Sequence, residues 1–186
     1  MSAGAGLPAA DSTQHVVQFY GSDDDMADRA SRYLTAGLRR GETAVVVATA
    51  ANLRAVEARM SVTNDIAAAR AQGRFVTLDA VEALDRILIR SRLSPPAVER
   101  MVADLVSEAP AASTGICLYG EMGALTWNVG RPDTTIALEA VWRDLCQRLP
   151  LRSLCGYPAS LACQSGSALR DLCDLHTAVA GIPPLI

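Results

Sequence analysis

The segment Ala44–Thr49, with the sequence Ala-Val-Val-Val-Ala-Thr, decides the fold class of this chain. It is a continuous apolar run, rich in β-branched residues, and it is too short for a stable helix. A strand without polar alternation is typically buried on both faces, as in a parallel sheet that helices cover on each side. We therefore predict a central strand here and an α/β fold around it.

The rest of the chain alternates between strand patterns and helical patterns. Four further strands are predicted, at His15–Tyr20, Arg74–Leu78, Ile116–Tyr119 and Leu154–Tyr157. Apolar residues at helical spacing predict helices within residues 23–41, 52–60, 65–71, 80–88, 95–106, 121–128, 134–149 and 168–178, with a loop at 159–167. Strands separated by helices imply right-handed crossovers. The prediction is a three-layer α/β fold with a mainly parallel sheet of five or slightly more strands.

Length and composition limit the class of protein. The chain has 186 residues, of which 50% are hydrophobic and 20% charged, as expected for one folded domain. We predict a disordered tail at 1–13 and one domain at 14–186. A net charge of −3 provides no electrostatic footprint for nucleic acid, so direct DNA binding is not expected. Neither a secretory signal nor a membrane-spanning run is recognisable, so we expect a cytoplasmic protein with reduced cysteines.

The segment Gly21–Asp25 follows the first predicted strand and has the sequence Gly-Ser-Asp-Asp-Asp. A phosphate-binding loop at this place needs glycine N–H groups, a lysine, and a serine or threonine for magnesium. The chain contains no lysine, and three carboxylates occupy the positive end of the predicted helix. We therefore expect neither ATP hydrolysis nor any mechanism that uses a lysine amine.

A series of motifs along the chain resembles a known family. The motifs are His15-Val-Val-Gln-Phe-Tyr20, Gly37-Leu-Arg-Arg-Gly-Glu42 before the central strand, Tyr119-Gly-Glu-Met122 with Trp127 soon after, Leu154-Cys-Gly-Tyr-Pro158, and His176. In order and spacing they are similar to the MEDS family, the methanogen, methylotroph and DcmR sensory domains. The resemblance extends from His15 to about Pro184.

The resemblance implies a RecA/KaiC-like fold that lacks the nucleotide site, and a sensory role in place of catalysis. It implies a small ligand derived from hydrocarbons, bound without a cofactor. It also implies a separate regulatory protein as partner, which would be a kinase, an anti-sigma factor or a transcription regulator. Because signalling modules are commonly symmetric, we expect a homodimer.

Ligands of open parallel sheets collect beyond the carboxyl ends of the strands. The residues predicted at that edge combine aromatic rings, a hydroxyl and two acids, and they are Tyr20, Thr49, Asp79, Glu121 and Tyr157. This composition suits a mostly apolar pocket with a few polar groups. Each residue also has a structural alternative, because acids cap helices and buried tyrosines pack with satisfied hydroxyls.

Histidine and cysteine side chains form a second candidate group. The family resemblance adds His15 to the candidate ligand-binding residues, and its structural alternative is a hydrogen bond to a backbone carbonyl. His176, late in the last predicted helix, lies three residues after Cys173, and these two residues with Cys155 and Cys163 would complete a four-ligand zinc site. Free cysteines are commonly buried as small hydrophobes, so we predict no metal.

Two alternatives to the sensory prediction stay open. One is a metal or redox sensor that uses these cysteines and His176. The other is an enzyme, either a degenerate ATPase or a hydrolase with Cys155 as nucleophile and His176 as base.

Overall fold

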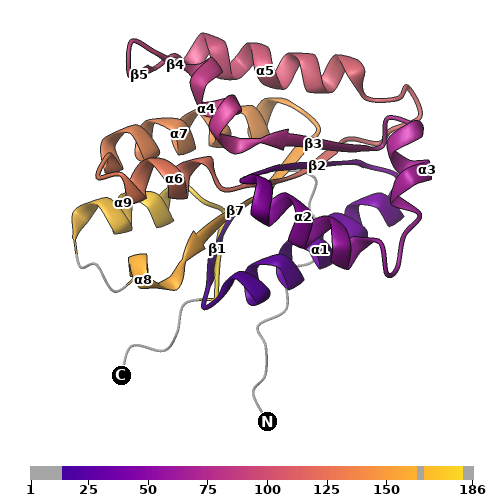
Figure 1. Cartoon of the computed structure of the whole chain (residues 1–186). Coiled ribbons are helices and arrows are strands. Elements are labelled where there is room, and N and C mark those ends of the chain that lie inside the picture. Colours follow the sequence, from indigo (N-terminus) through magenta and orange to yellow (C-terminus); the bar gives the residue numbers. More distant parts are fainter. Residues whose placement is uncertain (1–13, 163–165, 182–186) are drawn as a thin grey trace.

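Six parallel strands form the main sheet of the computed structural model, which describes residues 14–162 and 166–181 (Figure 1). The strand order is β3-β2-β6-β7-β1-β8, and every adjacent pair is parallel. The strands are β1 His15–Tyr20, β2 Thr43–Ala48, β3 Phe75–Asp79, β6 Ile116–Gly120, β7 Leu151–Pro158 and β8 Ala178–Ala180. The predicted mainly parallel α/β sheet is confirmed, with one strand more than the five found in the sequence.

One helical layer covers the first face of the sheet. It consists of α1 (Asp23–Arg39), α2 (Ala50–Met60) and α3 (Ile66–Ala71). Val46 of β2 and Leu154 of β7 point into this layer, where they belong to one buried cluster with side chains of all three helices. Ser22 caps α1, because its Oγ accepts a hydrogen bond from the N–H of Asp25 at 3.2 Å.

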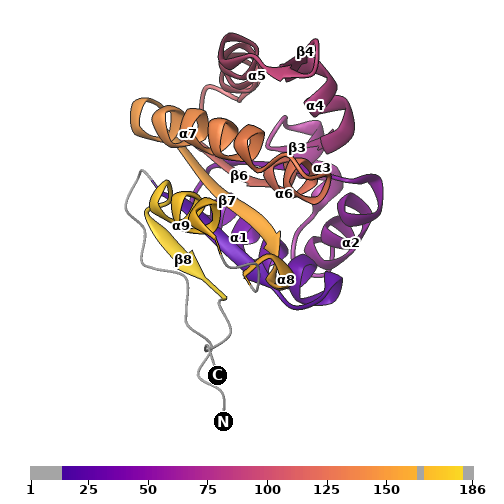
Figure 2. The ribbon, with the colours of Figure 1, turned by 90° about the vertical axis from the view of Figure 1, so that its left-hand side faces the viewer.

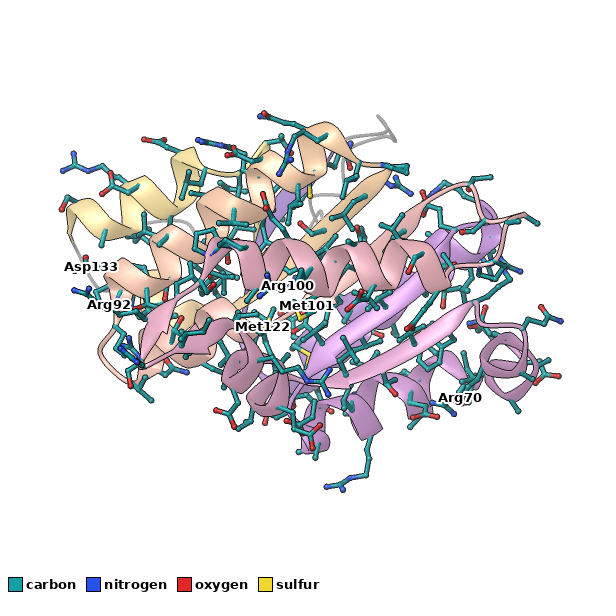
Figure 3. The ribbon with its side chains drawn as sticks, turned by 90° about the horizontal axis from the view of Figure 1, so that it is seen from above. Arg70, Arg92, Arg100, Met101, Met122 and Asp133 are labelled. Atoms are coloured by element: carbon teal, nitrogen blue, oxygen red, sulfur yellow. The ribbon has the colours of Figure 1, made fainter. Side chains whose placement is uncertain are left out.

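The second helical layer covers the opposite face. It consists of α4 Ala80–Ile87, α5 Pro95–Glu108, α6 Met122–Asn128, α7 Pro132–Arg148 and α9 Ser167–Asp174. Val45 and Val47 of β2 point into this layer, with Met101 of α5 and Met122 of α6 in the same buried cluster. Figure 3 shows α5 lying across this face, with Met101 and Met122 labelled. The three predicted layers are thus present.

The register of β1 and β7 puts three polar or reactive side chains on the second face. His15 pairs with Ser153, Val17 with Cys155, and Phe19 with Tyr157. Because alternate residues of a strand point to the same face, His15, Cys155 and Tyr157 all point toward α7 and α6. Tyr20, one position further along β1, ends the strand at its carboxyl edge.

Some elements differ from the prediction. The last helix ends at Asp174, before His176, and the chain then forms β8 along the edge of β1 (Figure 2). A two-stranded antiparallel hairpin, β4 (Leu88–Ile89) and β5 (Arg92–Leu93), follows α4, and α8 (Ala159–Ala162) lies in the predicted loop. These elements are two to four residues long, too short to show a sequence period.

Several predictions concern residues whose structure is not described. The tail at 1–13 and Cys163 lie outside the described residues. Within the described part of the chain, no helix combines the length and the apolar composition that crossing a bilayer requires.

Candidate functional site

A pocket of about 360 Å³ lies over the carboxyl ends of four strands. It is lined by Tyr20, Gly21, Ser22, Asp23, Thr49, Asn52, Glu121, Ala124, Leu125, Asn128, Pro158, Ala159 and Ser160. These residues end β1, β2, β6 and β7 or begin the segments that follow. The volume and the mixture of apolar walls with a few polar groups are typical of small-molecule sites. We call this site the carboxyl-edge pocket.

Glu121 is the buried acid of the carboxyl-edge pocket. Its Oε1 accepts a hydrogen bond from the N–H of Thr49 at 2.5 Å, and its Oε2 accepts one from Nδ2 of Asn52 at 2.7 Å. Glu121 therefore joins the end of β6 to the start of α2. Burial, followed by the carboxylates of Glu121 and Asp23, raises the pKa of Tyr20, so this phenol stays neutral in the pocket.

The helix end beside the pocket is already occupied by the protein's own acids. The side chain of Asp25 accepts a hydrogen bond from the N–H of Gly21 at 3.2 Å, while the N–H of Asp25 donates to Ser22. Arg29 Nε lies 2.5 Å from Asp25 Oδ1. The N–H groups of Gly21 and Asp25 at this helix end thus have partners within the protein, and the nearby carboxylates would repel added anionic charge.

Two of the predicted edge residues do not line the pocket. Asp79 caps α4, because its Oδ1 accepts hydrogen bonds from the N–H groups of Val81 (2.8 Å) and Glu82 (3.2 Å). Tyr157 is buried below the edge, and its hydroxyl donates to Glu139 Oε1. Tyr20, Thr49 and Glu121 are the predicted edge residues that the structure brings together.

A second group of side chains meets at the other end of β1. It consists of His15, Glu139, Cys155 and His176, which we call the buried quartet. Their ligand atoms all lie within 4.8 Å of one another. The side chains of His15, Glu139 and His176 are at most 2% exposed, and Cys155 is buried.

Glu139 is the centre of the buried quartet. Its Oε2 lies 3.0 Å from His15 Nε2, 3.4 Å from His176 Nε2 and 3.4 Å from Cys155 Sγ. Cys155 Sγ lies 3.4 Å from His15 Nε2. Burial by itself would raise the pKa of Glu139, but the two histidines outweigh it and hold that pKa well below its usual value.

The quartet overlaps only in part with the cysteine and histidine group taken from the sequence. Cys155 and His176 are in it, whereas Cys173 is half-buried on α9 and is not among the converging residues. Sequence reasoning missed Glu139. It lies within the apolar stripe of α7, and an acid buried among core positions is the one signal that could have pointed to it.

The fold and the pocket define a three-layer, parallel α/β protein with a small pocket at the carboxyl edge and acids where a phosphate loop would lie. The family described as MEthanogen/methylotroph, DcmR Sensory domain (MEDS) matches residues 14–177. The chain therefore belongs to this family of sensory domains. No curated protein and no solved structure was found to match it, so the RecA/KaiC-like likeness stays a prediction.

Proposed function

We propose that this chain is a non-enzymatic sensory module that binds a small, largely apolar molecule in the carboxyl-edge pocket. The observation that carries the proposal is the position of that pocket, over the ends of β1, β2, β6 and β7, where parallel sheets bind ligands. Membership of a sensory family supports the same role. The family's description names methylotrophs, which favours small hydrocarbon-derived compounds.

The walls of the pocket support an uncharged ligand. Ala124, Leu125 and Pro158 supply apolar surface, and the Tyr20 phenol is neutral. Both oxygens of Glu121 already accept hydrogen bonds, and Asp23 adds a negative charge at the rim. A ligand with one donor group and an apolar body fits this pocket better than a phosphate or a carboxylate does.

Catalysis by Cys155 is disfavoured by its surroundings. Burial, followed by the Glu139 carboxylate, raises the pKa of the Cys155 thiol well above its usual value. The thiolate is the nucleophilic form, so the residue is protonated at neutral pH. The thiol also lies inside the core, away from the carboxyl-edge pocket, which leaves a substrate no open approach.

A thermal-shift panel of small alcohols, aldehydes and halogenated hydrocarbons tests the proposal, with ATP and magnesium as the comparison. A ligand at 100 times its dissociation constant adds about 2.7 kcal/mol of stability. Asn128→Trp should abolish the shift, because Asn128 is exposed and lines the pocket. Val129→Trp is the matched control, since Val129 is 71% exposed and is not among the lining residues.

Stabilisation by magnesium and ATP alone, or a ligand shift that persists in Asn128→Trp, would contradict this proposal. Substrate turnover that disappears in Cys155→Ala would favour the hydrolase alternative.

The signal is proposed to pass to a separate regulatory protein, with the module acting as a homodimer. Sedimentation with and without the ligand found in the panel would measure that oligomeric state.

A further inference from the structure

The buried quartet stands apart from the carboxyl-edge pocket. His15 and Tyr20 are the two ends of β1, about 16 Å apart at roughly 3.3 Å per residue. The quartet draws one residue each from β1, α7, β7 and the segment between α9 and β8. None of the four lines the pocket. Its role is therefore a separate question from ligand sensing.

Both histidine rings are oriented by backbone carbonyls. His15 Nδ1 lies 3.1 Å from the carbonyl oxygen of Leu175, and His176 Nδ1 lies 2.7 Å from that of Leu172. A carbonyl oxygen only accepts, so each Nδ1 carries the proton and donates it. In a neutral ring this leaves a lone pair on Nε2. The same outer arrangement orients histidines that bind metal ions.

The two Nε2 atoms face a group that cannot donate to them. Both lie near Oε2 of Glu139, at 3.0 Å and 3.4 Å, so three lone-pair sites converge when both rings are neutral and the carboxyl group is ionised. His176 Nε2 is fully buried and has no hydrogen-bond partner. One added proton would serve only one ring, and two would place two imidazolium ions face to face, since the ring centroids are 3.9 Å apart. A cation between the four side chains would satisfy them all.

The spacing and chemistry of the ligand atoms fit a tetrahedral ion. Ligands at the zinc distances of about 2.0–2.3 Å are roughly 3.3–3.8 Å apart from one another. The observed separations are 3.0 Å for His15 and Glu139 and 3.4 Å for the three other measured pairs. For these four pairs an ion needs movements of only a few tenths of an ångström, and every ligand atom lies within 4.8 Å of the others. Two imidazoles, a carboxylate and a thiolate favour zinc over calcium or magnesium.

We propose that the buried quartet binds one divalent ion of the zinc class in a closed, four-coordinate site. On binding, the S–H bond of Cys155 breaks, the sulfur bonds to the metal, and the proton leaves to solvent. No electron is transferred. Tyr157 and the carbonyls of Leu172 and Leu175 orient the ligands from outside. The ion ties β8 and α9 to the central strands.

The test begins with elemental analysis of the full chain, purified without added metal and then loaded with Zn²⁺. We expect one equivalent of bound metal per chain. After removal of the metal by a chelator, Co²⁺ should give the intense visible bands of a tetrahedral site and a thiolate-to-cobalt charge-transfer band. Tyr157→Phe keeps all four ligands but removes the hydroxyl that orients Glu139, and it should weaken Co²⁺ affinity by about 10–100-fold.

Cysteine variants identify the sulfur ligand. Cys155→Ser should lose the charge-transfer band, whereas Cys173→Ser, the matched control on α9, should keep it. Loss of the band in Cys173→Ser, or its persistence in Cys155→Ser, would overturn the proposed ligand set. Absence of bound metal and of a tetrahedral Co²⁺ spectrum in the unmodified chain would overturn the site itself. Because that measurement needs no variant, it tests the presence of the metal site even if Cys155→Ser does not fold.

Discussion

Two glycines provide space for buried side chains, Gly123 on the second face of the sheet and Gly156 on the first face, where Tyr119 packs. A Cβ on Gly123 of α6 would lie 2.0 Å from the Tyr157 hydroxyl and 2.6 Å from Glu139 Oε1. A Cβ on Gly156 would lie 2.4 Å from the Tyr119 hydroxyl. The Tyr157–Glu139 hydrogen bond, and the orientation of the quartet that depends on it, therefore require the absence of a side chain at position 123.

Gly123→Ala is expected to destabilise the protein by about 1–3 kcal/mol, the usual cost of overpacking a core. The sign is informative, because Gly→Ala inside a helix otherwise stabilises by roughly 0.5–1 kcal/mol. Urea unfolding measures the change. Gly21→Ala is the control, since a Cβ there meets nothing within 4 Å, and it should change stability by less than about 0.5 kcal/mol. If Gly123→Ala were more stable than the unmodified chain, Tyr157 and Glu139 would not approach position 123 this closely.

At the scale of elements, the position of β8 depends on a few hydrogen bonds made by the residue just before it. It has three residues and pairs with β1 from Val16 to Gln18. Just before it, the N–H of Thr177 donates to the carbonyl of His15 at 2.7 Å. The Thr177 hydroxyl donates to the same oxygen at 2.9 Å and accepts from the N–H of His15 at 3.2 Å. One side chain thus fixes both the start of β8 and the backbone of His15.

Thr177→Val should cost about 0.5–1.5 kcal/mol, the net value of a typical hydrogen bond, because valine keeps the shape but loses the hydroxyl. Hydrogen exchange of the β8 amides and urea unfolding measure the loss. Thr177→Ser keeps the hydroxyl and should restore most of the protection. If valine and serine behaved alike, the hydroxyl would not be the group that holds β8.

At the scale of the whole molecule, the interior holds thiols that ionise only at high pH. Burial, followed by the Glu42 carboxylate, raises the pKa of Cys117 from 9.0 to about 12. Burial likewise raises the pKa of Cys146 to about 11. Between these values and 9.0 the unfolded chain loses protons that the folded chain keeps, so folding becomes less favourable as pH rises.

We therefore expect stability to be unaffected by these thiols below pH 9 and to fall progressively from about pH 9 to 12, by at most about 1.4 kcal/mol per pH unit for each thiol. Urea unfolding as a function of pH measures the slope. Cys117→Ala should lower stability at every pH but flatten the slope above pH 9. Cys173→Ala, which removes a half-buried thiol, should change the slope less. An unchanged slope in Cys117→Ala would contradict a raised pKa of the Cys117 thiol.

The elements that the sequence predicts well carry their signal locally. β1 begins and ends at the predicted residues, because His15–Tyr20 is a short segment rich in β-branched and aromatic residues before a glycine and a capped helix. β2 is buried at every position, as its unbroken valines indicated. Tyr20, Thr49 and Glu121 line one pocket because each ends or directly follows a strand whose carboxyl end faces the same edge.

What the sequence by itself determined is the alternation of strands and helices, since backbone propensity and hydrophobic period are properties of neighbouring residues. Only the tertiary structure decided the strand order, which puts Asp79 on the outermost strand and turns Tyr157 toward Glu139. It also decided the buried quartet, whose members lie at positions 15, 139, 155 and 176. Such a convergence depends on which distant segments pack together, and no local pattern records that.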